Sequence, residues 1–434
     1  MPSPTLQIGA NSSTTAVAGQ RPILACIGGG LTPYKDHYLR RVSAEIPELD
    51  LWLLNTYHPS VEPWGQTRLT TLNVEVLDNR ASRSALLPLE ALAQWTVGGR
   101  AIEFLSKRNV AAAVINGYNN IANIRVLRYC RSRAIPVILH ADSNAYGDTL
   151  KGPARTFKNW HVPWVLGHAK ALCVFGGLGK TYYLRYGARP EQIFYSPYEP
   201  DYKQIADLDE AFIDSVAAQF RLDRSRKRII FCGRLVNAKR PDLAIDSFAA
   251  ISARRPEWDL LMVGDGPMRE WVKWRVPSDL RHRVIFTGFT SDQRAVSAFY
   301  RLSDVLILPS DFEPWALVVN EGIGAGLAGV VSNVVGAAPE LVRDGANGYV
   351  FPRGDRNALR KALMDVTDPN NLRRMQHQSR VVIDHWRTVA DPVQGLRNAL
   401  RFAGVQGLAD HPGPVLQPIP PAPAEFAEPV ASAN

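Results

Sequence analysis

Two carboxylates eight positions apart mark the stretch PSDFEPWALVVNEG, residues 309–322. Glu313 is expected in the loop after the apolar run DVLIL, and Glu321 on the helix that follows. Ligands of open α/β sheets bind outside the carboxyl ends of the strands, so both acids lie where a ligand is expected. Charged acceptors suit hydroxyl-rich ligands. An E-x7-E pair alone would indicate an exposed loop residue and a solvated helix residue, and it is the surrounding sequence that favours a binding site.

The start of that helix could bind an anion. Its first backbone N–H groups carry the positive end of the helix dipole and would face a phosphate or a hydroxyl-rich ligand. The residues expected here are Pro314, Trp315, Ala316 and Leu317.

A basic loop, GRLVNAKRP at residues 233–241, follows the apolar run RIIFC. Arg234 is expected at the end of a strand and Lys239 at the start of a helix, where the two cations could clamp a diphosphate. A basic loop on a basic protein explains the same residues about as well.

The strands and helices that are expected to position these groups alternate along the chain from about residue 22 to residue 350. Short runs that are apolar on every side are typical of parallel strands covered on both faces, and longer helical segments separate them. The pattern predicts two doubly wound α/β domains in tandem. The expected strands are Ile23–Ile27, Leu51–Leu54, Ala111–Ile115, Pro136–Leu139, Ala171–Phe175, Arg228–Cys232, Asp259–Val263, Val284–Thr287, Asp304–Leu308 and Gly329–Ser332.

Five segments of the second half, in this order, resemble the GT-B-fold retaining glycosyltransferases of family four (group one). They are GRLVNAK, LMVGDGP, VIFTGFTSD, SDVLILPSDFEPWALVVNEG and VVSNVVGAAPELVRDGANGYVFPRGD. The resemblance covers roughly residues 22–400. It implies an α/β protein with the GT-B fold, in which two Rossmann-like domains face each other across a cleft.

The resemblance also implies roles for the site residues. Arg234 and Lys239 match the pair that neutralises the diphosphate of a nucleotide-sugar donor. Glu313 matches the acid that binds the donor sugar, and Glu321 the acid that binds the ribose. The glycine loop after the first strand matches the loop that approaches the phosphates, although Thr32–Lys35 departs from the commoner glycine pattern. The remaining donor-binding residues are Gly29, Gly30, Gly233, Gly264, Gly266, Phe289 and Thr290.

Two candidates in the first half lie at the end of the strand VILH. His140 and Asp142 match positions that contact the donor sugar or the acceptor in many relatives, against the alternative of a strand-end histidine and a helix cap. Lys158 and His161 lie in the stretch RTFKNWHVPW and could meet an anionic acceptor or a lipid phosphate. Core packing by the neighbouring tryptophans explains that stretch nearly as well.

The expected function is that of a retaining, metal-independent hexosyltransferase. Its donor would be a nucleotide-diphosphate sugar as co-substrate, with no cofactor and no metal. Its acceptor would be a glycan or a lipid-linked saccharide, in surface polysaccharide or lipopolysaccharide synthesis. A nucleotide-sugar epimerase or a phosphorylase on the same fold, and a non-catalytic partner subunit, stay open as alternatives. Nucleic acid is not an expected partner, because the chain has no clustered basic and aromatic module.

Composition and charge bound the remaining expectations. The chain is 46% hydrophobic with a net charge of +9, which is typical of a folded protein that binds anionic ligands. Four scattered cysteines predict reduced thiols, and we expect a cytoplasmic protein with peripheral contact to an anionic inner membrane face. The expected segments are a disordered start (1–20), an acceptor domain (21–200), a linker (201–227), a donor domain (228–378), a helix that crosses back (379–404) and a disordered Pro/Ala-rich tail (405–434).

Overall fold

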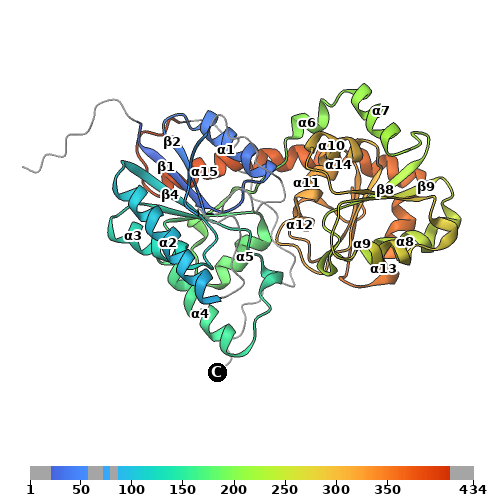
Figure 1. The fold of residues 1–434 in the computed structure, drawn as a ribbon. Helices are drawn as coiled ribbons and strands as arrows, with labels where there is room; N and C mark the ends of the chain where they lie inside the picture. Colours follow the sequence, from blue (N-terminus) through green and yellow to red (C-terminus); the bar gives the residue numbers. More distant parts are fainter. Residues whose placement is uncertain (1–20, 57–71, 79–86, 411–434) are drawn as a thin grey trace, which may run out of the picture.

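The computed structural model describes residues 21–56, 72–78 and 87–410. The expected disordered start and the tail beyond residue 410 lie outside this range. Within it the chain forms two α/β domains side by side, each built on a parallel sheet (Figure 1). The predicted architecture of two parallel-sheet, Rossmann-like domains is therefore confirmed.

The described part of the first sheet has the strand order β3-β2-β1-β4-β5-β6-β7. Most of its strands are nearly continuous apolar runs, as expected where helices cover both faces of a sheet. They are β1 (Ile23–Gly28), β2 (Asp50–Asn55), β3 (Asn73–Val76), β4 (Val110–Asn116), β5 (Val137–His140), β6 (Ala171–Val174) and β7 (Ile193–Tyr195).

Helices α2 (Leu87–Ser106), α3 (Ile121–Ser132), α4 (Gly152–Leu166) and α5 (Gly177–Arg185) share one hydrophobic cluster with the first sheet. Helices α1 (Pro33–Glu45) and α15 (Pro392–Phe402) share another. Right-handed crossovers that step in the same direction along a sheet lie on the same face, which places α2 to α5 together.

The described part of the second sheet has the order β10-β9-β8-β11-β12-β13. Its strands are β8 (Lys227–Cys232), β9 (Trp258–Val263), β10 (Val284–Gly288), β11 (Val305–Leu308), β12 (Ala328–Ser332) and β13 (Gly348–Phe351). Its helices are α6 (Tyr202–Ala206), α7 (Glu210–Gln219), α8 (Pro241–Ile251), α9 (Arg269–Arg275), α10 (Gln293–Arg301), α11 (Leu317–Gly324), α12 (Ala338–Leu341), α13 (Arg356–Val366) and α14 (Pro369–Val389).

The connection between the domains differs from the expected linker at 201–227. Helix α7 packs into the core of the second domain through Ile213, Val216 and Ala217. The helix expected at 379–404 is interrupted, because α14 ends at Val389 and α15 begins at Pro392. Proline lacks the N–H that would continue the helical hydrogen bonds, so the chain turns here and α15 packs on the first domain.

Arg41 on α1 holds both points where the chain passes between the domains. Its Nη1 donates to Glu199 Oε1 at 2.5 Å, just before α6, and its Nη2 to Asp391 Oδ2 at 2.7 Å, at the start of α15. Burial raises the pKa of Glu199 to about 6, although the charge of Arg41 opposes this rise. One guanidinium thus ties the two crossings to the first domain.

All four cysteines are buried free thiols, as predicted. Among the helices of the described residues, none is long and apolar enough to cross a membrane.

Candidate functional site

The chain leaves β8 and β11 in opposite directions, toward β9 and β12, although these two strands are neighbours in the sheet. Such a reversal opens a crevice at the carboxyl ends of the strands. Lys239, after β8, meets Glu313, after β11, at this place, with Lys239 Nζ 2.5 Å from Glu313 Oε1. Ser310 Oγ donates to the same carboxylate oxygen at 3.0 Å. Both side chains of the pair are largely buried.

Glycines let the neighbouring loops close around this pair. The side chain of Lys239 lies against Gly233, where a Cβ atom would be 3.1 Å from Lys239 Cδ. A Cβ atom at Gly264 would lie 2.1 Å from the carbonyl oxygen of Gly233, and one at Gly266 2.5 Å from that of Leu235. These positions exclude any larger residue because the backbones after β8 and β9 touch.

Arg234 lies beside Gly233 with an exposed side chain. Its guanidinium forms no hydrogen bond or ion pair with any residue that the structure describes, so it is free to bind an anion. Phe289, 48% exposed, and Thr290 follow β10, and Gly264 N donates to the Gly288 carbonyl at 3.0 Å. The loops after β8, β9 and β10 therefore form one rim.

Glu321, on α11, forms no hydrogen bond or ion pair with Lys239 or Glu313. The thiol of Cys232, however, interacts electrostatically with both Glu321 and Lys239. Glu321 lines a cavity of about 420 Å³ between α1 and α10, and its Oε2 accepts a hydrogen bond of 2.8 Å from Tyr300 Oη. Burial raises the pKa of Glu321 to about 7, although the hydrogen bond from Tyr300 lowers it. A carboxyl group at this pKa changes charge near neutral pH.

The first turn of α11 has no side-chain cap, and Ala316 before it has a left-handed backbone with φ 81°. The Val319 amide already donates to the Ala316 carbonyl at 2.9 Å, so the amides of Leu317 and Val318 are the ones that a ligand could reach. The Trp315 side chain is buried instead. Its Nε1 donates to Asn320 Oδ1 at 2.9 Å, and its ring stacks on Trp386, so this indole belongs to the core.

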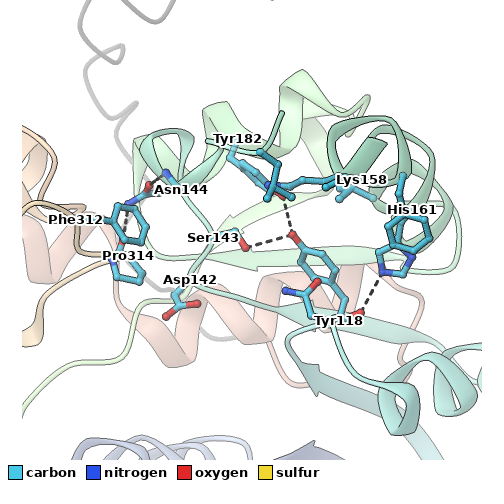
Figure 2. Close-up of a pocket in the computed structure, with 15 residues that line it drawn as sticks. Tyr118, Asp142, Ser143, Asn144, Lys158, His161, Tyr182, Phe312 and Pro314 are labelled. Atoms are coloured by element: carbon cyan, nitrogen blue, oxygen red, sulfur yellow. Dashed lines mark hydrogen bonds between the residues drawn. The ribbon is translucent and has the colours of Figure 1, made fainter. Parts of the chain in front are cut away.

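A second cavity, of about 430 Å³, lies between the domains (Figure 2). Asp142 lines it with an exposed side chain, and partial desolvation raises the pKa of its carboxyl group. The other lining residues that carry polar groups or rings include Tyr118, Asn119, Ser143, Asn144, Phe157, Lys158, His161, Tyr182, Phe312 and Pro314.

Neither expected basic residue of this cavity offers a free charge. Lys158 Nζ lies 2.9 Å from Asp148 Oδ1, which Arg155 also contacts at 2.7 Å. His161 is buried, and its Nε2 donates to the Tyr118 carbonyl at 3.3 Å. The groups left facing the cavity are hydroxyls, amides, aromatic rings and one carboxyl group.

Asn144 is a site residue that the sequence pattern did not single out. It is buried, and its Nδ2 donates to the carbonyl oxygens of Glu313 and Pro314, each at 2.9 Å, across the domain boundary. Its Oδ1 accepts from the Gly147 amide at 3.0 Å. The only sequence signal is its place shortly after β5, at the carboxyl edge of the first sheet.

A second contact crosses the boundary nearby. Glu340 Oε1 on α12 accepts a hydrogen bond of 2.7 Å from the Gly177 amide, at the N-terminus of α5. Burial raises the pKa of Glu340, and the bond from Gly177 opposes this rise. The positive end of the α5 dipole favours the carboxylate at this position.

His140 does not reach either cavity. It is buried against the rings of Tyr38, Phe175 and Tyr198, and its Nε2 donates to the Ser196 carbonyl at 2.7 Å. Burial lowers the pKa of His140 to about 4, so the ring is neutral at physiological pH. The structure therefore gives His140 a packing role, whereas Asp142, two residues on, faces the cavity.

The glycine loop after β1 bends sharply. Gly30 has φ 72°, a left-handed conformation that favours glycine, and the buried Lys35 donates to the Gly29 carbonyl at 3.0 Å. This lysine holds the loop at the switch between β1 and β4, opposite the second domain.

These loops and their charged pair lie in a segment with known relatives. Residues 213–380 match the family of glycosyl transferases group 1. The group 1 segment includes Arg234, Lys239, Glu313 and Glu321 together with the glycines between them.

Two curated relatives overlap part of the chain. An uncharacterized glycosyltransferase of Methanocaldococcus jannaschii is 33% identical over 29% of this chain and 32% of its own length. A GDP-mannose-dependent alpha-(1-6)-phosphatidylinositol dimannoside mannosyltransferase of Mycobacterium tuberculosis is 30% identical over 37% of this chain and 41% of its own length. The chain thus spans less than half of either relative.

Solved structures match nearly the whole chain. HepE of Anabaena, in complex with UDP, aligns with a TM-score of 0.66 at 16% identity, over 87% of this chain and 99% of its own. A sucrose-phosphate synthase of Thermosynechococcus elongatus gives 0.66 at 16% identity, over 88% and 100%. At this identity the likeness establishes the fold, which is the GT-B arrangement of two Rossmann-like domains.

Proposed function

We propose that this chain transfers a hexose from a nucleotide-diphosphate sugar to a glycan or lipid-linked saccharide. The observation that carries the proposal is the contact of Lys239 with Glu313 at the switch point of the second sheet, beside the free guanidinium of Arg234. The two cations can bind the phosphates of the donor, and the carboxylate can accept hydrogen bonds from its sugar hydroxyls, so one crevice can bind both halves of the donor. The group 1 match of the same segment supports it.

Lys239 can serve the donor without losing Glu313. An ammonium group has three N–H donors, so one can stay on Glu313 while the others turn to a phosphate. The contact with Glu313 fixes the lysine before the donor arrives, which reduces the entropy lost on binding. Lys239 and Arg234 then stabilise the negative charge that grows on the leaving diphosphate.

The two cavities fit the two remaining parts of the reaction. Glu321 would accept hydrogen bonds from the ribose beside Tyr300, in the cavity between α1 and α10. The acceptor would occupy the cavity of Asp142, and because Lys158 and Arg155 are already paired with Asp148, a neutral, hydroxyl-rich acceptor fits better than an anionic one. Aromatic rings such as Phe157 and Phe312 offer apolar faces to a sugar ring.

The finer proposals concern stereochemistry, metal and setting. We propose retention of the anomeric configuration, with the leaving phosphate helping to remove the acceptor proton. The two cations supply the charge for which a metal would otherwise be used, so transfer should survive a chelator. Assembly of surface polysaccharide or lipopolysaccharide is the proposed setting, and the fold neighbour WaaG, a glycosyltransferase involved in lipopolysaccharide biosynthesis, supports it.

A thermal-shift screen with UDP, GDP and ADP sugars tests the donor site. A donor at about 100 times its Kd stabilises the folded protein by about 2.7 kcal/mol, which gives a clear rise in Tm. Lys239→Ala should lose that rise. Lys273→Ala removes a half-buried lysine of α9, away from the proposed donor site, and should keep the rise in Tm.

Three results would count against the proposal. If no nucleotide sugar raises Tm, the chain lacks the proposed donor site. An equal rise in the Lys239→Ala and Lys273→Ala variants would place the donor away from Lys239. Interconversion of donors without any acceptor would instead support the epimerase alternative.

A further inference from the structure

Large apolar side chains are exposed at the N-terminal halves of two helices of the first domain. Six of them are between 48% and 63% exposed, and it is their grouping that sets them apart from scattered surface residues. We call this set the apolar rim, and it comprises Leu89, Leu92 and Trp95 on α2, Leu150 just before α4, and Phe157 and Trp160 on α4.

Topology brings the rim residues to one edge of the first domain. Helices α2 and α4 cover the same face of the sheet, as their shared cluster shows. Each follows a strand of a parallel sheet, so both helices begin at the carboxyl edge. Figure 1 shows α2 and α4 near one another, on the opposite side of the first domain from α15.

Cations lie beside both parts of the rim, although Arg155 and Lys158 on α4 are paired with Asp148. Lys151 is exposed beside Leu150, and Arg125 lies 3.8 Å from the ring centre of Trp95.

We infer that the apolar rim docks this protein onto an anionic lipid bilayer. Aromatic and leucine side chains enter the interface of a membrane, and neighbouring lysines and arginines bind its anionic headgroups. An RNA would be attracted by the basic side chains and could stack on the tryptophans. It would gain nothing from the leucines, which make up half of the rim. A second copy of the chain, docked through the same rim, would bring Lys151 and Arg125 of both copies together, and this like-charge contact is unfavourable.

The rim also borders the cavity between the domains, because Leu150 and Phe157 belong to both. In the docked protein, the mouth of this cavity would therefore lie at the membrane surface. Delivery of a lipid-linked acceptor through that opening rests on the proposed function, whereas docking itself does not.

Vesicle flotation with the full chain tests the inference. Vesicles of phosphatidylcholine with about 30% phosphatidylglycerol should bind the protein at least about tenfold more strongly than phosphatidylcholine alone, and added salt should weaken the binding. Trp160→Ser and the double variant Leu89→Ser/Leu92→Ser should each reduce the partition by about tenfold, because the lost side chains carry the buried apolar area. Trp274→Ser, at a tryptophan of the second domain that is 77% exposed, is the matched control and should float like the original chain.

Equal binding to neutral and anionic vesicles, or unchanged flotation of the rim variants, would overturn the inference. Saturable binding of an RNA oligonucleotide that the rim variants lose, without vesicle binding, would reassign the surface to nucleic acid. The nucleotide-sugar thermal shift, measured on the same variants, keeps the two proposals separate. A rim variant that loses vesicles but keeps the donor shift leaves the donor site standing, whereas a protein that floats but shows no donor shift leaves only the docking surface.

Discussion

At the scale of single residues, the contact between Lys239 and Glu313 is a largely buried ion pair at the proposed donor site. We expect Lys239→Ala and Glu313→Ala each to lower sugar transfer by about 100-fold or more, because each removes charge placed for the transition state. The measurement is the initial rate of product formation with a donor that raises Tm. A rate within twofold of the original in either variant would contradict the assignment.

The same pair should also show coupling in stability. Removing one partner leaves the other largely buried without its counter-charge, so each single variant should be destabilised. The double variant should lose less than the sum, with a coupling of about 0.5–3 kcal/mol in denaturant unfolding of the second domain. Strict additivity would show that the ion pair has no energetic role.

Glu321 should make stability depend on pH. Its pKa is raised to about 7 in the folded protein, above the value of an unfolded glutamate, so the folded state holds the proton more tightly. The benefit is fully present below about pH 4.5 and is lost as the pH rises through about 7. Relative to Glu321→Gln, the original chain should therefore lose about 1–3 kcal/mol over this range.

Thermal unfolding at about pH 5 and about pH 8, compared between the two proteins, measures that difference. Parallel changes in Tm would mean that the carboxyl group of Glu321 has the same pKa in both states.

His140 should matter for stability and not for turnover. His140→Phe keeps an aromatic ring in the cluster but leaves the Ser196 carbonyl without its donor, which should cost about 1–3 kcal/mol. Transfer measured well below the lowered Tm should stay close to the original rate. A loss of turnover with an unchanged Tm would instead restore the catalytic role that the sequence pattern indicated.

At the scale of elements, Asn144 joins the loop after β5 to the loop after β11. Asn144→Ala should lower kcat by about 10-fold to 100-fold, because a small misplacement of catalytic groups has a large kinetic effect. The nucleotide thermal shift should change little, since Arg234, Lys239 and Glu321 all lie in the second domain. Asn159→Ala, at an exposed position of α4, is the control. A rise in KM alone would show that Asn144 affects binding of the acceptor and not the position of Glu313.

Most strands of both sheets were predictable because each is an apolar run that ends in a polar or small residue. The short strands β3, β7 and β13 were not predicted, since NVEV, IFY and GYVF carry too few buried residues to stand out. The resemblance implied that Lys239 and Glu313 bind the same donor, whereas their direct contact was found only in the structure. The aromatic enclosure of His140 and the reach of Asn144 across the boundary could not be predicted, because both depend on contacts between distant segments.

At the scale of the whole molecule, the domain boundary holds two hydrogen-bonded contacts close to the crevice, from Asn144 to the Glu313 loop and from Glu340 to Gly177. Contacts of this kind suit a reaction that must exclude water, because the donor would otherwise be hydrolysed. The buried rings of Trp315 and Phe175, one from each domain, pack edge to face at the same boundary. Polar and apolar contacts therefore close the crevice together.

The return of α15 to the first domain has a consequence for the order in which the protein is made. Val393, Leu396 and Leu400 complete the hydrophobic cluster beneath β1 and α1. A ribosome therefore releases nearly the whole second domain before the first can bury that surface. The first domain can finish folding only after about 200 further residues, those between β7 and α15, have been synthesised.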